Sequence, residues 1–338
     1  MTSERLMLVA ALLLGAWTSA SAQTSTSSIP RTPDGKPDLQ GFWDAATLTP
    51  LERPRQGQGK TLTPAEATAI ERAAAERRDR GVRPSDPNRK APPAGGVDSA
   101  GGVGGYNGFW VDRGSSVTSI NGEARTSIVV DPADGRVPPF TPEGRARARA
   151  RRELANTFDD VEARPLGERC LMSFGSSAGP PALPVMYNNI KQIVQTPDQV
   201  MILNEMVHDA RIVRMHGPHL PGSIRKWLGD SIGRWEGDTL VVETTNFTSK
   251  TFFRGSSEKL KVIERFTRLD AKTLLYQFTV EDSATWARPW SGEYVWAWSE
   301  QPLYEYACHE ANYSLEGILK GARRQDADGS ASNVGRPR

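Results

Sequence analysis

The sequence predicts a mainly β fold with minor α content, in which antiparallel strands curl into a barrel and N-terminal helices and extended segments lie outside it. Between residues 187 and 300, apolar side chains recur at every second position, as they do in half-buried strands. Turn signals such as Glu236-Gly237-Asp238 and Asp270-Ala271-Lys272 separate these runs. The chain also contains 24 prolines and 31 glycines, which indicates short elements joined by many loops.

The first of these runs, near residues 200–208, has apolar side chains on both of its faces. One face carries Val200, Ile202, Asn204, Met206 and His208, and the other carries Met201, Leu203, Glu205 and Val207. A strand covered on both sides is typical of a barrel wall with further chain packed outside it. The same phase, continued along the chain, places His208 and His216 on one face. With His219, three of the four histidines therefore fall in one short stretch, which is the first candidate for a site.

The N-terminus predicts a signal peptide over residues 1–22. Arg5 precedes an apolar run, and Ala20-Ser21-Ala22 matches a cleavage pattern. The run is too short to span a membrane, and no later stretch reaches about 18 apolar residues, so no integral membrane segment is expected. The mature protein is expected to be soluble and to lie in the periplasm or the secreted medium. In that oxidising compartment the two cysteines, Cys170 and Cys308, are predicted to form a disulfide.

Three regions follow the predicted signal peptide. Residues 23–110 form a proline- and glycine-rich segment with one helix, residues 111–322 form the barrel domain with one inserted helix, and residues 323–338 form a disordered tail. The first helix is expected from Pro64 to Gly81, because Thr63 suits the N-cap and proline suits the first helical position. The inserted helix starts at Thr141 and continues through the arginines of residues 145–152. Those arginines form either a solvated helix face or a surface for an acidic partner.

One carboxylate is expected on the inner face of a strand. Glu264 alternates with Val262 and Phe266, so its side chain has apolar neighbours. Burial raises the pKa of such a carboxyl group unless a cation is near, which is the condition for a general acid or base. The alternative is a buried ion pair with an arginine from the next strand. A second periodic feature, the aromatic stripe of Trp290, Tyr294, Trp296 and Trp298, indicates either a pocket for a flat apolar molecule or core packing.

These features predict a site for acid/base chemistry. The catalytic candidates are His208, Asp209, Arg211 and Glu264, and the substrate-contacting candidates are His216, His219, Trp235, Tyr276, Trp290, Tyr294 and Trp296. No cofactor is expected. The alternative is zinc or another divalent metal held by His208, His216 and His219, although eight residues of extended strand between the first two would keep them about 26 Å apart.

Nine segments carry a resemblance to a large family of exported bacterial proteins of unassigned activity. They are TPDGKPDLQGFWD, RTSIVVDPADGRVPPFTPEGRARA, GERCL, GPP, YNNIKQIVQTPDQVMILNEMVHDARIV, WLGDSIGRWEGDTLVVETTNF, VIERFTRLD, TWARPWSGEY and LYEYACHEANYSLEGIL. The resemblance implies one unit rather than a fusion of two known modules. The hairpin GRWEGDTLVVE also resembles those of lipocalin-like barrels, by analogy alone.

Three functions remain open from the sequence. The first is an exported enzyme of the lyase, isomerase or hydratase type that acts on a partly apolar or aromatic small molecule in a barrel pocket. The second is a periplasmic lipocalin-like carrier for such a molecule, and the third is a structural envelope protein. A formal net charge of +2 gives no argument for nucleic acid as a partner. Nothing in the sequence predicts an oligomeric state.

Overall fold

The computed structural model describes residues 29–54, 57–83, 88, 111–155, 157–174, 179–310 and 312–328. The predicted signal peptide, the glycine-rich stretch before residue 111 and the last ten residues of the predicted tail lie outside these ranges. Among the described residues, no helix is long and apolar enough to cross a membrane.

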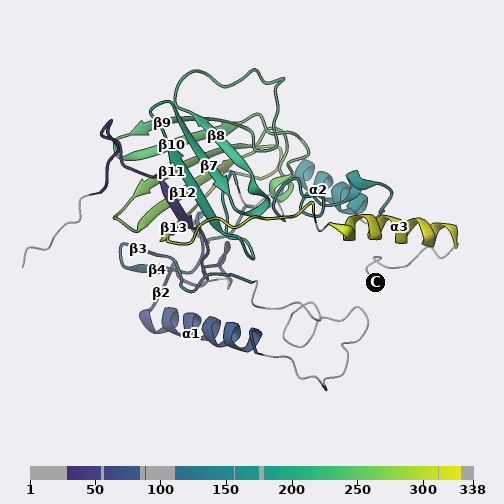
Figure 1. The fold of residues 1–338 in the computed structure, drawn as a ribbon, viewed down its shortest axis with the longest axis horizontal. Coiled ribbons are helices and arrows are strands. Elements are labelled where there is room, and N and C mark those ends of the chain that lie inside the picture. The colour runs from purple at the N-terminus through teal and green to yellow at the C-terminus, as the bar shows by residue number, and fades with distance from the viewer. Residues whose placement is uncertain are drawn as a thin grey trace, which may run out of the picture.

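A closed barrel of nine strands forms the body of the molecule, which confirms the predicted fold class (Figure 1). In sheet order the strands are β1 (Gly41–Asp44), β6 (Ile190–Gln195), β7 (Gln199–Asn204), β8 (Ala210–Arg214), β9 (Asp230–Glu236), β10 (Thr239–Thr245), β11 (Lys261–Arg268), β12 (Thr273–Glu281) and β13 (Trp290–Ser299). The barrel closes because β1 pairs with both β6 and β13. A tenth strand, β5 (Val129–Asp131), also pairs with β13.

The barrel is mixed, so the prediction of a wholly antiparallel barrel is wrong for one pair of strands. β8 and β9 run parallel, with Val213 opposite Ser231. A parallel pair requires a connection that carries the chain back to the end where the first strand began. The segment from Met215 to Gly229 is long enough to do this, and its Gly-Pro and Pro-Gly turns were expected to lead into a simple hairpin series.

The short strand β1 comes from the segment that was expected to lie outside the barrel domain. Its Trp43 has no solvent exposure and packs edge-on against Trp298 of β13, with ring centroids 5.4 Å apart. The guanidinium of Arg268 lies 5.3 Å from the Trp43 ring centroid. This aromatic and cationic contact fixes β1 between two strands that are distant in sequence, so the N-terminal segment supplies part of the barrel wall.

The elements outside the barrel include both predicted helices. α1 (Pro64–Gly81) begins with a capping box between Thr63 and Glu66, and α2 (Pro142–Ala155) follows Thr141. A small sheet of β2 (Thr61–Leu62), β3 (Ser119–Ile120) and β4 (Glu123–Arg125) lies with α1 on one side of the barrel (Figure 1). A third helix, α3 (Tyr313–Ala327), was not predicted and includes the first residues of the expected tail. Within the described ranges, 3₁₀ turns include η2 (Val161–Ala163), η4 (Met206–His208) and η5 (Phe253–Gly255).

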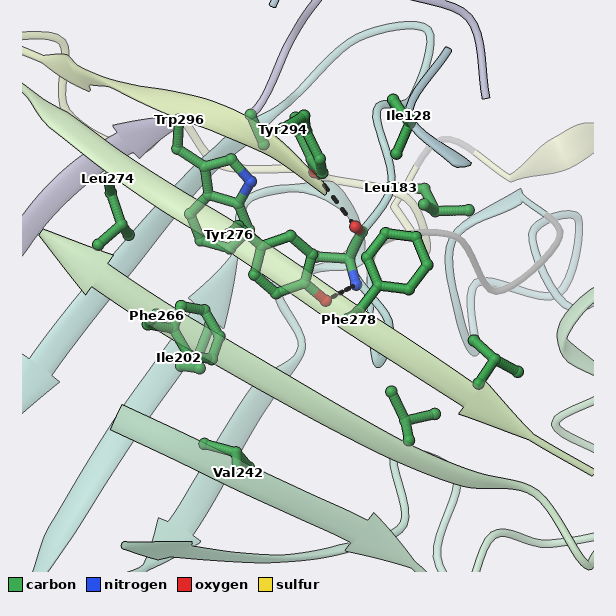
Figure 2. Close-up of a cluster of buried hydrophobic side chains, with 14 of the residues drawn as sticks. Ile128, Leu183, Ile202, Val242, Phe266, Leu274, Tyr276, Phe278, Tyr294 and Trp296 are labelled. Atoms are coloured by element: carbon green, nitrogen blue, oxygen red, sulfur yellow. Dashed lines mark hydrogen bonds between the residues drawn. The ribbon is translucent and has the colours of Figure 1, made fainter. Parts of the chain in front are cut away.

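Large aromatic side chains fill the barrel interior (Figure 2). Tyr276 and Trp296 stack with ring centroids 4.8 Å apart, and Phe266 lies 5.1 Å from Tyr276. The Tyr276 hydroxyl accepts a hydrogen bond from the amide of Ala182 at 2.8 Å, and the Tyr294 hydroxyl donates to the Ala182 carbonyl at 3.1 Å. The loop that carries Ala182 is thereby held against the aromatic core at one end of the barrel.

The predicted disulfide is present and joins Cys170 to Cys308, which confirms the pairing. It links the segment that precedes this loop to the segment after β13. Nearby, the rings of Tyr187 and Tyr306 stack with centroids 6.4 Å apart. The bond and the stacked rings together tie the segment after β13 to the residues around Cys170 and Tyr187.

Candidate functional site

Two of the predicted catalytic residues form a buried ion pair inside the barrel. Both terminal nitrogens of Arg211 donate to the carboxylate of Glu264, with Nη2 to Oε1 at 3.0 Å. Tyr276 donates its hydroxyl proton to Oε1 at 2.9 Å, and burial with the nearby Glu264 charge raises the pKa of Tyr276 well above its ordinary value. Glu264 has no solvent exposure. The carboxylate is therefore paired with an arginine, as the alternative interpretation of Glu264 expected. That arginine lies on β8, across the barrel, and not on the strand next to β11.

The other two catalytic candidates lie on a strained turn between β7 and β8. Val207 and His208 adopt φ values of 63° and 45°, in the left-handed region that β-branched residues rarely occupy. This turn ends the strand at Asn204 and reverses the chain, so the predicted single run with His208 and His216 on one face is wrong. His208 is exposed, whereas Glu264 is fully buried. The four candidates therefore do not line one pocket.

A lysine that the sequence interpretation missed lies inside the barrel at this end. Lys191 of β6 is 1% exposed, and burial lowers its pKa to about 7. Burial also raises the pKa of Asp209 to about 6, with the charges of His208 and Lys191 acting in the opposite direction. The alternation of Lys191 with the buried Ile193 was the available signal, since it places the lysine on the inner face.

The remaining histidines lie apart from His208. His216 is exposed and approaches Asp198 at 3.5 Å, while His219 lies between Asp230, at 3.0 Å from Nδ1, and Glu243, at 3.3 Å from Nε2. Within the described ranges, no group of three or more His, Cys, Asp and Glu side chains is arranged to hold a metal ion. The straight strand β8 separates His208 from His216, so the alternative metal set is not assembled.

The predicted aromatic contacts are core residues with one exception. Tyr276, Trp290, Tyr294 and Trp296 have no solvent exposure. Trp235 of β9 is partly exposed, and the Lys36 ammonium lies 6.0 Å from its ring centroid. Trp298, the last residue of the predicted stripe, is partly buried and packs against Trp43. The aromatic stripe therefore packs the core, which was the alternative to a ligand pocket.

A groove of about 750 Å³ lies outside the barrel, where α2 and η5 approach the segment before α2. None of its lining residues was singled out from the sequence as a single-residue candidate. They are Glu52, Val137, Pro138, Pro139, Phe140, Ala148, Arg151, Arg152, Ala155, Ala163, Pro165, Leu166, Lys250, Thr251, Phe252, Arg254, Gly255 and Trp286. The lining combines aromatic and proline surface with four cations and one carboxylate, so it can contact both an apolar body and a negative charge.

Two lining residues have a strained backbone. Phe252 and Arg254 flank the buried Phe253 and have φ values of 52° and 47°. Such conformations cost free energy in residues other than glycine and persist where surrounding structure imposes them. With this backbone conformation, the aromatic side chain of Phe252 and the cationic side chain of Arg254 both line the groove.

The cations of the groove differ in how closely carboxylates approach them. Arg254 approaches Glu52 at 3.7 Å with 37% of its side chain exposed, and burial lowers the pKa of Arg254. Glu52 also accepts a hydrogen bond from the Val137 amide at 2.9 Å. Lys250 pairs with Glu162 at 3.1 Å and remains 62% exposed. Arg254, whose ion pair is the longer of the two, therefore keeps hydrogen-bond donors for a further anion.

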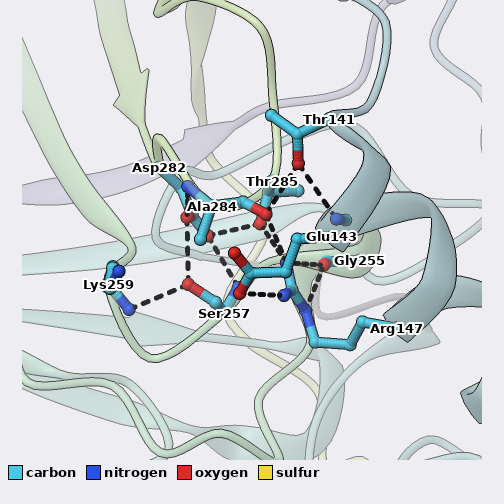
Figure 3. A network of polar contacts seen from close by, with 10 residues as sticks. Thr141, Glu143, Arg147, Gly255, Ser257, Lys259, Asp282, Ala284 and Thr285 are labelled. Carbon is cyan, nitrogen blue, oxygen red and sulfur yellow. Dashed lines mark hydrogen bonds and ion pairs between the residues drawn. The ribbon is translucent and has the colours of Figure 1, made fainter.

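A buried network holds α2 against the barrel and so fixes one side of the groove (Figure 3). Arg147 donates to Thr285 Oγ1 at 2.5 Å, and Thr285 donates to Asp282 Oδ2 at 2.6 Å. Ser257 donates to the same carboxylate from its hydroxyl at 2.9 Å. A methyl group at Gly144 would lie 2.5 Å from the Thr285 carbonyl, so only glycine permits this approach. One face of the basic helix α2 therefore packs against the barrel, so the helix is not wholly solvated. An acidic partner could contact only its remaining faces.

Comparisons of this chain with protein-family models, with curated proteins and with solved structures find no match.

Proposed function

We propose that this protein is an exported small-molecule-binding protein and that the groove beside α2 is its ligand site. The observation that carries the proposal is the groove itself, whose volume of about 750 Å³ falls in the range of small-molecule sites. The barrel interior offers no comparable support, because residues such as Tyr276 and Trp296 pack it. The proposed protein is thus a carrier, as one hypothesis from the sequence had it. Its ligand site lies outside the barrel, whereas the sequence had suggested a pocket inside it.

The chemistry of the lining favours binding over catalysis. Among the described residues of the groove there is no histidine, cysteine or tyrosine to move a proton. The carboxylate of Glu52 is occupied by the Val137 amide and by Arg254. Acid/base catalysis needs a positioned group that can exchange a proton near the working pH. Arginine and lysine side chains, in contrast, are suited to holding an anion.

Export is supported by the disulfide between Cys170 and Cys308, since such bonds persist in oxidising compartments. The predicted signal peptide and the resemblance of the motifs to exported bacterial proteins support the same proposal. Fractionation of cells that express the full chain tests it. Recovery of the protein in the periplasm or medium, shortened by about 22 residues, is the expected result. Uncleaved protein in the cytoplasm with reduced cysteines would contradict it.

The ligand site is tested by filling the groove. Ala148 of α2 lines it, whereas Ala150 of the same helix is exposed outside it. Purified protein is incubated with a mixed metabolite extract, and native mass spectrometry then records retained masses. We expect Ala148→Trp to abolish retention and Ala150→Trp to keep it. Thermal unfolding shows that both variants fold. Retention unchanged in folded Ala148→Trp would move the site elsewhere, and no retention by the wild type would reject the function.

A second function is favoured by one observation at the barrel end. Burial raises the pKa of Asp209 to about 6, so this carboxyl group can gain or lose a proton close to neutral pH. It lies next to the exposed His208, and such a pair suits a general acid or base. The same extract tests it, because an enzyme consumes a metabolite that a carrier only retains. Depletion that stops in both His208→Ala and Asp209→Asn would support the enzyme. Absence of depletion by the wild type would reject it.

A further inference from the structure

We infer that the ligand of this groove is an amphipathic carboxylate, a molecule with one negatively charged head group on an apolar or aromatic body. The inference rests on the proposed function and names the chemical class that the site takes. It follows from the distribution of charge in the lining, the engagement of the individual cations and the surface that remains for the apolar body.

The charge of the lining selects an anion. Arg151 and Arg152 come from α2, and Lys250 and Arg254 come from the loop that contains η5, so cations reach the groove from two elements. Glu52 is the single carboxylate among the lining residues. An ammonium ligand would be repelled by the positive charges on both elements. A neutral ligand would gain no charge attraction from these cations. Glu52 at Arg254 and Glu162 at Lys250 offset part of this charge, and the cations that remain in excess favour an anionic head group.

The cations differ in how much they are engaged, and this locates the head group. Among the described residues, Arg152 makes no ion pair, and Arg254 is held only at 3.7 Å by Glu52. Arg151 donates to the Glu162 carbonyl at 3.3 Å, and Lys250 pairs with the Glu162 carboxylate. Arg152 and Arg254 therefore have the most donor capacity left. A guanidinium presents parallel N–H groups that match the two oxygens of a carboxylate.

The remaining lining suits the apolar body of such a ligand. Pro138 and Pro139 are rigid, and Phe140 lies beside the buried Trp286 with ring centroids 6.4 Å apart. Phe252 adds a third ring, which the left-handed backbone holds in place. Rings and prolines lose little conformational entropy on binding, so this surface is pre-organised.

Calorimetric titration with three probes of equal chain length tests the class. The probes are decanoate, 1-decanol and decyltrimethylammonium, each used below the concentration at which it aggregates. We expect decanoate to bind at least about tenfold more tightly than the other two, since a charge-assisted hydrogen bond contributes this much or more. The preference should weaken as salt is raised, because the arginines are partly exposed.

Charge-removing variants locate the head group. Arg152→Gln and Arg254→Gln should each weaken decanoate binding about tenfold and leave decanol binding unchanged. Arg149→Gln is the matched control on α2, since Arg149 is 82% exposed, pairs with Glu153 and does not line the groove. Equal affinity for decanoate and decanol would overturn the anion assignment while binding itself stands. Failure of decanoate to bind would also overturn it, and the function falls only if the metabolite extract yields no retained mass either.

Discussion

Arg211 of β8 and Glu264 of β11 are joined by a two-pronged ion pair inside the barrel, and the pair is 6% and 0% exposed. The two strands are separated in the sheet by β9 and β10, so the pair spans the barrel interior rather than one ladder. Tyr276 completes the network by donating to the same carboxylate. Because both charges are compensated, the pair stabilises one arrangement of the walls instead of providing a reactive group.

Removal of one partner of this pair should destabilise the fold. Glu264→Gln leaves the Arg211 charge buried without its counter-ion, and loss of one partner of such a pair costs about 3 to 5 kcal/mol. Urea unfolding followed by tryptophan fluorescence measures the difference. Glu236→Gln, at the exposed pair with Arg265, is the control and should change the free energy of unfolding little. A Glu264→Gln variant as stable as the wild type would contradict the structural role.

The disulfide should stabilise the protein and protect its C-terminal segment. It closes a loop with a sequence separation of 138 residues, for which the chain-entropy model gives up to about 5 kcal/mol. α3 buries none of its side chains fully, so the bond is a principal tie for this segment. We expect a double Cys170→Ala, Cys308→Ala variant to unfold at lower urea and to lose α3 to protease first. Free thiols in unreduced, denatured wild type would contradict the pairing.

Lys191 should make stability rise with pH above neutrality. Its pKa is about 7 in the folded protein, below the ordinary 10.5, so between these values the unfolded chain binds the additional proton. Stability therefore increases as pH rises from about 7 to 10, by at most about 1.4 kcal/mol per pH unit. Lys191→Met should flatten this slope, and Lys272→Met, at an exposed turn, should keep it. An unchanged slope in Lys191→Met would show that other groups cause it.

Relief of the strained backbone at His208 should stabilise the fold. His208→Gly removes a side chain from a residue with φ of 45°, and we expect the free energy of unfolding to rise by about 0.5 to 1 kcal/mol. Ala210→Gly, in the extended strand β8 two residues later, should lower it by a similar amount. If His208→Gly is instead destabilised, the side chain makes a structural contact that outweighs the strain.

The anchor of α2 should control the groove. Arg147→Met removes the hydrogen bonds to Thr285 and to the carbonyl of Gly255 while it keeps the aliphatic part of the side chain. We expect amide hydrogen exchange in α2 to accelerate and ligand retention to fall, because the groove loses its fixed wall. Arg149→Met, on the exposed face, should leave both measurements unchanged. Unaltered exchange in Arg147→Met would show that other contacts hold the helix.

The local elements of this protein follow from patterns within short stretches of its sequence. The alternation of apolar and polar residues predicts strands such as β11 and β12, because successive side chains of a strand point to opposite faces of the sheet. Thr63 and Glu66 define the start of α1 through hydrogen bonds within four residues. Two cysteines allow one intramolecular pair, so the disulfide needed no knowledge of the fold. All of these features depend on short-range geometry or on simple counting.

Tertiary structure alone decided the closure of the barrel and the location of the groove. β1 lies between β6 and β13, and β9 runs parallel to β8, although strand pattern carries no information about distant partners. The groove combines Glu52, Phe140, Arg152, Arg254 and Trp286, which come from four stretches far apart in the chain. Likewise, Arg211 is a buried counter-ion because β11 places Glu264 opposite it. These relationships arise from burial and charge pairing between segments far apart in the chain, which the spacing of residues along one segment does not encode.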